Sequence, residues 1–149
     1  MRQVTARLLL LAVAVPQAAT GAWALFAPRR WFDGFPGAGH VWVAPLGPYD
    51  EHLVVDVGSA LLALSVLAAW GAIVRAPALR AAAAATLLIF SVPHLVYHSA
   101  NGGLNATEGA LNLTSLALAV ALPAAALLLT TVPIRSVPVG RVSATGAVL

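Results

Sequence analysis

Four long hydrophobic stretches, separated by more polar segments, dominate the pattern along the chain. They cover about residues 5–26, 50–74, 79–100 and 106–131. Each is as long as the roughly 20 apolar residues that a helix needs to cross a bilayer. The pattern therefore predicts an all-α protein, a four-transmembrane-helix antiparallel bundle that forms one domain over residues 1–131. A polar tail over 132–149 follows it.

Local signals support the boundaries of these helices. Asp50 and Glu51 precede the second stretch, where negative charge favours a helix N-terminus. Asn101-Gly102-Gly103 is typical of a helix end. Asn105-Ala-Thr-Glu108 has the pattern of a capping box that opens the fourth helix. The Glu108 carboxylate is then either used in this capping box or free for chemistry.

The first stretch is also compatible with a secretory signal peptide. Arg2 and Arg7 form a charged start, an apolar segment follows, and Ala22-Trp23-Ala24 resembles a cleavage site. The apolar run nevertheless continues to Phe26, which is long enough to span a bilayer. We therefore predict a retained first transmembrane helix and keep the cleaved signal peptide as the alternative.

Composition places the chain in a membrane. Hydrophobic residues make up 60% of it and charged residues only 9%, whereas a soluble domain has about 25% charged residues. The net charge is +3, and no basic run is interleaved with aromatic residues, so nucleic acid is not an expected partner. Because cysteine is absent, disulfides and thiolate metal ligands are excluded.

The distribution of arginine predicts the orientation. Six arginines fall on one side of the predicted bundle and two on the other: Arg2, Arg7, Arg75, Arg80, Arg135 and Arg141 against Arg29 and Arg30. The positive-inside rule then puts both termini in the cytoplasm of a cell whose plasma (inner) membrane the protein crosses. The long first loop, residues 27–50, is predicted to be extracellular.

This first loop is rich in aromatic residues, which favour the headgroup level of a membrane. They include Trp31, Phe32, Phe35 and Trp42, and residues 40–43 are predicted to be extended. Loops of this length are usually functional or form a cap. We expect His40 to be solvated, and Asp33 with Arg29 or Arg30 to form a surface ion pair of little energetic weight.

Polar side chains recur at helical spacing in the outer half of each predicted helix. The stripes are Gln17 and Thr20; His52, Asp56 and Ser59; Ser91, His94, His98 and Asn101; and Glu108, Asn112 and Ser115. A charge that faces lipid at the bilayer centre costs roughly 2.5–3.5 kcal/mol on insertion scales. We therefore expect the stripes to meet inside the bundle.

Two histidines four residues apart, His94 and His98, share one helix face. With His52 and Asp56 on the facing helix they provide three nitrogens and a carboxylate, a set that suits zinc, copper or non-haem iron. A haem held by two of the histidines ranks below this. If the metal is catalytic, metal-assisted redox or hydrolytic chemistry on an apolar substrate is expected, with Glu51 or Glu108 handling protons.

Two other interpretations of the polar cluster stay open at this point. It is alternatively a pocket for protons or a ligand, or a purely structural hydrogen-bond network of the kind that joins membrane helices. The protein would then be a non-catalytic accessory subunit of a larger quinone-linked or transport complex. The Ala- and Gly-rich helix faces also permit a homo-oligomer.

At Gly47-Pro-Tyr-Asp-Glu-His-Leu-Val-Val-Asp56 and Pro93-His-Leu-Val-Tyr-His98 the chain resembles small actinobacterial membrane proteins. Its layout over about Thr5 to Thr131 is similar to the DoxX-like group. Some members of that group are small subunits linked to quinone-dependent oxidoreductases. The resemblance implies the four-helix fold and redox partners, and it assigns no functional residue.

Overall fold

The computed structural model describes residues 1–131, and the predicted tail lies outside them. Within this range the chain forms five α-helices: α1 (Arg2–Phe26), α2 (Pro28–Gly34), α3 (Glu51–Ile73), α4 (Pro77–Ala100) and α5 (Ala106–Thr131). All but α2 are long and apolar enough to cross a membrane. The predicted all-α class with four candidate transmembrane helices is therefore confirmed.

The helix boundaries follow the capping chemistry. The carboxylate of Asp50 accepts a hydrogen bond from the Leu53 N–H at 3.1 Å, which satisfies one of the free donors of the first turn of α3. The side-chain oxygen of Asn105 does the same for the Glu108 N–H at 3.0 Å, before α5. Helix α4 begins at Pro77, slightly before the predicted start, because proline is favoured at the first helical position.

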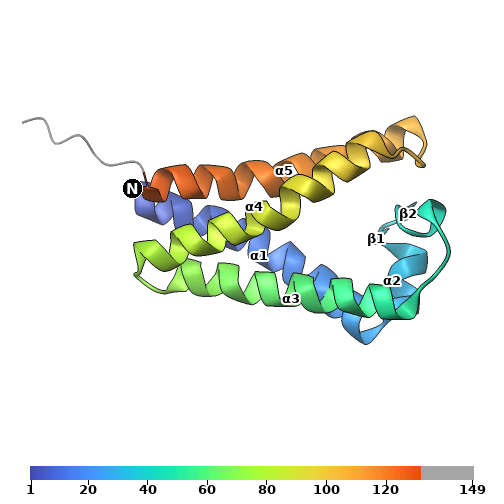
Figure 1. The fold of residues 1–149 in the computed structure, drawn as a ribbon, viewed down its shortest axis with the longest axis horizontal. Coiled ribbons are helices and arrows are strands. Elements are labelled where there is room, and N and C mark those ends of the chain that lie inside the picture. The colour runs from blue at the N-terminus through green and yellow to red at the C-terminus, as the bar shows by residue number, and fades with distance from the viewer. Residues whose placement is uncertain (132–149) are drawn as a thin grey trace, which may run out of the picture.

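The four long helices form an antiparallel ring in which each packs mainly against two others. Helices α1 and α4 both contact α3 and α5. As Figure 1 shows, the start of α1 and the end of α5 lie at the same end of the bundle, together with the α3–α4 turn. We call this the arginine end, because it carries Arg2, Arg7, Arg75 and Arg80. The opposite end, which carries residues 27–50 and the α4–α5 turn, is the loop end.

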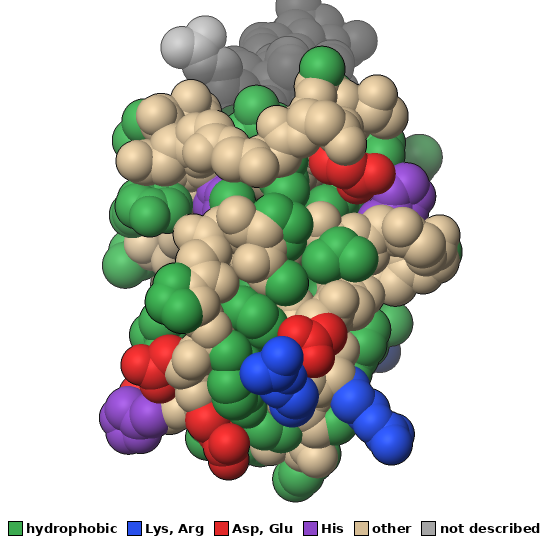
Figure 2. Space-filling model, turned by 90° about the vertical axis from the view of Figure 1, so that its right-hand side faces the viewer, with side chains coloured by type: hydrophobic (Ala, Val, Ile, Leu, Met, Phe, Trp, Pro, Cys, Tyr) green, Lys and Arg blue, Asp and Glu red, His purple; other side chains and the backbone are tan. Residues whose placement is uncertain are grey.

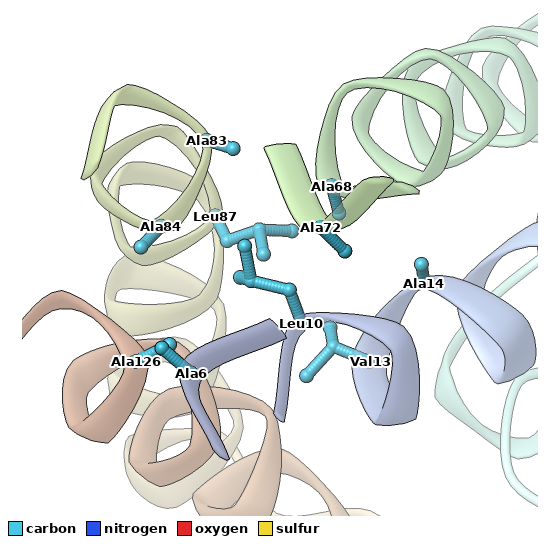
Figure 3. Close-up of a cluster of buried hydrophobic side chains, with 10 residues drawn as sticks. All are labelled: Ala6, Leu10, Val13, Ala14, Ala68, Ala72, Ala83, Ala84, Leu87 and Ala126. Carbon is cyan, nitrogen blue, oxygen red and sulfur yellow. The ribbon is translucent and has the colours of Figure 1, made fainter. Parts of the chain in front are cut away.

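The main core lies in the half of the bundle nearer the arginine end and joins all four long helices (Figure 3). Its buried residues are Ala6, Leu10, Val13, Ala14, Ala68, Ala72, Ala83, Ala84, Leu87 and Ala126. Most of them are alanines, whose small side chains let the helix backbones approach closely. Towards the loop end, Figure 1 shows the α4–α5 hairpin diverging from α1 and α3.

Two glycines set the contact between α1 and α3. A Cβ atom on Gly21 would lie 2.8 Å from the Gly58 carbonyl oxygen, and one on Gly58 would lie 2.7 Å from the Leu25 nitrogen. Both neighbours are backbone atoms, which do not move aside easily. The close approach of the two helices therefore requires glycine at both positions.

The first loop folds over the ends of α1 and α3. It contains α2, a two-stranded antiparallel pair of β1 (Pro36–Gly37) and β2 (His40–Val41), and a 3₁₀ helix over Ala44–Leu46. The predicted extended piece is thus confirmed at β2. Helix α2 was not predicted, because seven residues are too few to show a helical period. Its Trp31 and Phe32 are buried against α1 and α3.

We expect Gly58→Ala to destabilise the protein by about 1–3 kcal/mol, the usual cost of overpacking. Gly109→Ala is the control, because a Cβ atom there meets nothing within 4 Å and alanine favours a helix by up to about 1 kcal/mol over glycine. Thermal unfolding in detergent, followed by circular dichroism, measures both variants. Equal unfolding temperatures for Gly58→Ala and the wild type would show that the helices are not in this close contact.

Candidate functional site: a polar cavity between α4 and α5

The two histidines of α4 continue the stripe by which this helix packs into the bundle. The buried residues of α4 are Arg80, Ala83, Ala84, Leu87 and Ser91, and the same spacing of three and four leads on to His94 and His98. Both imidazoles are half-buried. The ring centroids of His94 and His98 are 4.7 Å apart, and His94 also stacks on Phe90 at 5.4 Å. The predicted pairing of these two histidines on one face is therefore observed.

A small cavity of about 140 Å³ lies beside His98 at the loop end. Its polar side chains come from His98, Ser99 and Asn101 near the end of α4 and from Asn112 on α5. Leu46 of the first loop also lines it. The rest of its wall is formed by Gly102, Gly103, Leu104, Gly109 and Leu113. Asn112 is only 9% exposed, so its amide group is available mainly to the cavity.

Hydrogen bonding divides these polar side chains into two groups. Ser99 and Asn101 donate to carbonyls of their own helix, at 2.8 Å to Val96 and 2.9 Å to Tyr97. In contrast, no hydrogen bond from residues 1–131 reaches the rings of His94 and His98 or the side-chain amide of Asn112.

The absence of partners within the described chain has an energetic consequence. A polar group transferred from water to an apolar environment without a hydrogen bond costs roughly 1–3 kcal/mol in proteins. Asn112 is only 9% exposed, so water has little access to its side chain. The imidazole of His98 and the amide of Asn112 are therefore free to bind a molecule in the cavity.

The carboxylate of Glu108 joins the first loop to α5 through Trp42 and His40, and we call this contact the clasp. Glu108 accepts a hydrogen bond from the indole N–H of Trp42 at 2.6 Å, and His40 Nδ1 lies 2.9 and 3.1 Å from its two oxygens. A second contact is made by Leu46, whose Cδ2 would lie 2.7 Å from a Cβ atom on Gly103. These contacts hold Leu46 over the cavity, as expected of a loop that caps the outer end.

The predicted four-ligand metal site is not assembled. His52 and Asp56 face outward on α3, with side chains 89% and 61% exposed, and contact each other at 3.3 Å. Helix α3 instead turns Val54, Gly58 and Leu61 inward, because Gly58 must face α1. His52 and Asp56 each lie two positions from Val54, and two positions correspond to about 200° around a helix. They therefore point to the opposite side of α3. Among residues 1–131, no three His, Cys, Asp or Glu are grouped so as to hold a metal ion.

The structure also places the two predicted proton-handling carboxylates away from the cavity. Glu108 belongs to the clasp, so it completes only half of the predicted capping box: its N–H is capped, while its carboxylate binds His40 and Trp42. The prediction that His40 is merely solvated is wrong for the same reason. Glu51 is exposed in the first turn of α3, near Tyr49. Burial first, and then the charge of Glu51, raise the pKa of the Tyr49 phenol above its usual value.

Figure 2 looks onto the loop end, where carboxylates and histidines lie among apolar side chains. The predicted surface ion pair is present there: Arg29 Nε donates to Asp33 at 2.7 Å, and both side chains are exposed. Most charges on this end are therefore solvated or paired with a neighbour on the same helix. The clasp at Glu108 is different, since it joins segments far apart in the sequence.

Sequence reasoning placed Asn112 on a polar stripe but missed the contributions of Leu46 and Trp42. The only signal in the sequence was an aromatic loop that contains two tryptophans, together with an acidic residue at the start of a helix. Comparison of the chain with known protein families, with curated proteins and with solved structures found no match. The resemblance to the DoxX-like group therefore stays a prediction.

We expect Glu108→Ala to release the first loop, because hydrogen bonds to a charged group contribute about 1.5–3 kcal/mol each. Hydrogen–deuterium exchange of residues 40–46 should become faster. Glu51→Ala is the matched control, since it also removes a carboxylate from the first turn of a long helix at this end. Equal exchange in the two variants would contradict the clasp.

Proposed function

We propose that this small multi-pass membrane protein binds the polar ring of a lipid-soluble molecule, of the quinone class, in the cavity between α4 and α5. The observation that carries the proposal is the presence at this cavity of two polar side chains, His98 and Asn112, that have no hydrogen-bond partner within residues 1–131. The four helices that are long and apolar enough to cross a membrane support a lipid environment, in which such a molecule dissolves.

The size of the cavity supports a ligand with a single ring. Its volume is about 140 Å³, and an apolar cavity of about 150 Å³ in a protein holds one benzene molecule. A complete drug-sized ligand needs about 300–1,000 Å³. The cavity therefore suits one six-membered ring, while an attached tail remains in the lipid.

The two side chains also suit the chemistry of a quinone. An amide group offers both donors and an acceptor, and a neutral imidazole offers one of each. They can donate to the carbonyl oxygens of a quinone and accept from the hydroxyl groups of its reduced form. Imidazole is in addition a common proton donor and acceptor near neutral pH, which suits a ring that gains protons when it is reduced.

An accessory role in a larger redox complex fits this site better than catalysis by the chain alone. The predicted acidic groups, Glu51 and Glu108, do not line the cavity. The ionisable pair His52–Asp56 is exposed on the outer surface of α3, and ionisable residues of transmembrane helices usually serve a function or meet a partner. The predicted resemblance to the DoxX-like group likewise implies redox partner proteins.

The arginine distribution supports the orientation of the site. The described part of the chain carries Arg2, Arg7, Arg75 and Arg80 at one end and Arg29 and Arg30 at the other. By the positive-inside rule the arginine end is cytoplasmic. The cavity then lies in the outer half of the membrane, and both Met1 and Thr131 lie on the cytoplasmic side.

A metal ion held by His94 and His98 is the second candidate, favoured by the 4.7 Å separation of the two rings. The pair supplies two nitrogens, so zinc, copper or iron would need further ligands. Elemental analysis of the purified protein separates the candidates. A near-stoichiometric metal that is lost in His94→Ala would establish the metal centre instead of the ring site.

The proposal predicts that a short-chain 1,4-benzoquinone binds the protein in lipid nanodiscs. Asn112→Leu and His98→Leu should each weaken its binding at least about fivefold, because a lost hydrogen bond leaves the other group unsatisfied at about 1–3 kcal/mol. Titration followed by tryptophan fluorescence measures the affinity.

Thr114→Val is the control for this experiment. Thr114 lies on the same helix, is exposed and bonds only to the Ala110 carbonyl of its own helix, at 2.7 Å. Its replacement should leave quinone affinity unchanged. An equal affinity of the wild type, Asn112→Leu and His98→Leu would show that the quinone partitions into lipid without using this cavity.

A further inference from the structure

A second cavity, of about 290 Å³, lies at the arginine end, opposite the proposed ring site. Three arginines from different segments line it: Arg7 from α1, Arg75 from the α3–α4 turn and Arg80 from α4. Gln3, Val4 and Pro77 complete its wall. Such a concentration of guanidinium groups around one hollow is a property of sites that bind anions.

The protein holds two of these guanidinium groups in place. Arg7 donates through Nε to the Ala72 carbonyl and through Nη2 to the Ile73 carbonyl at 3.1 Å. Arg80 donates to the side chain of Gln3 and to the Val74 carbonyl. These carbonyls belong to the C-terminal end of α3, which otherwise leaves its last acceptors unsatisfied.

Donors remain after these contacts are made. A guanidinium group has five N–H donors, and Arg7 and Arg80 each use two atoms in the bonds above. Arg80 is only 2% exposed, and its Nε has no partner among residues 1–131. Arg75 is exposed at the rim. The cavity thus has a cationic floor whose guanidinium groups are held by hydrogen bonds, and an exposed cationic edge.

No acidic side chain compensates this charge. All five Asp and Glu residues lie in the loop-end half, at positions 33, 50, 51, 56 and 108. The ion pairs within residues 1–131 are Arg29–Asp33, His40–Glu108 and His52–Asp56, so none of them reaches Arg7, Arg75 or Arg80. The acidic side chains of this chain therefore do not neutralise these arginines, which favours an anion as the ligand of the cavity.

The start of α4 adds to the positive potential. This helix has 24 residues, begins at Pro77 beside the cavity, and has no side-chain cap on its first turn. The N-terminus of a helix carries a partial positive charge, which favours a nearby anion. The three arginines and the start of α4 therefore both favour a bound anion.

We propose that this cavity binds a phosphate group. Helix α3 spans roughly 1.5 Å per residue, and its 23 residues therefore match the roughly 30 Å hydrocarbon thickness of a bilayer. The arginine end consequently lies at the level of the lipid headgroups, where basic pockets between helices bind phosphate-containing headgroups. A headgroup phosphate and a free phosphate ion share this chemistry.

Titration of the delipidated protein in detergent distinguishes the two sources. The probes are short-chain phosphatidylglycerol, short-chain phosphatidylcholine and inorganic phosphate, with bound molecules counted by native mass spectrometry. Binding of phosphatidylglycerol in preference to the other two identifies a lipid headgroup site. Binding of inorganic phosphate that displaces the lipid identifies a site for a soluble anion.

In either case Arg75→Gln should weaken binding about fivefold, the effect expected of one basic residue at an anionic membrane surface. Arg75 is chosen because replacing the buried Arg80 would disturb the end of α3. Arg30→Gln, an exposed arginine at the loop end, is the matched control and should bind like the wild type. Equal losses in the two variants, or binding of none of the probes, would overturn the proposal.

Discussion

Inside a bilayer no water is available to a polar group, so each polar side chain of a transmembrane helix needs a partner in the protein or outside it. The described helices solve this in three ways. Hydroxyl groups bond to their own helix, as Thr86 does to the Ala82 carbonyl at 2.9 Å. Arg7 bonds to the end of α3. Glu108 binds donors from the loop. Several polar groups remain without a partner among the described residues, including Gln17 Oε1 and Arg80 Nε. We assign function to His98 and Asn112 because they, among these groups, line the cavity between α4 and α5.

The rotation of each helix decides which polar groups reach the cavity. Glycine at positions 21 and 58 brings α1 and α3 into backbone contact, and this turns His52 and Asp56 away from the bundle. Alanine contacts near the arginine end fix α4 so that its buried stripe runs on into His94 and His98. The cavity lies beyond this core, at the loop end of α4 and α5. Towards that end the α4–α5 hairpin diverges from α1 and α3 (Figure 1).

The sequence predicts the helices well, because the length of an apolar run and the residues at its ends are local properties. Asp50 and Asn105 mark the starts of α3 and α5, and both act as caps. Helix rotation depends on long-range packing, which explains why the facing of His52 was predicted wrongly. The bonds of Glu108 to Trp42 and His40 join residues more than 60 positions apart, so no local pattern indicates them.

The central claim is that His98 and Asn112 bind the ring of a quinone in the cavity. Nuclear magnetic resonance tests this claim most directly. The ¹⁵N signals of the Asn112 side-chain amide and the His98 imidazole can be followed in nanodiscs while a short-chain benzoquinone is added. The account predicts that these two signals shift together and saturate, while the exposed His52 ring stays unchanged. Unchanged Asn112 and His98 signals at saturating quinone would contradict it.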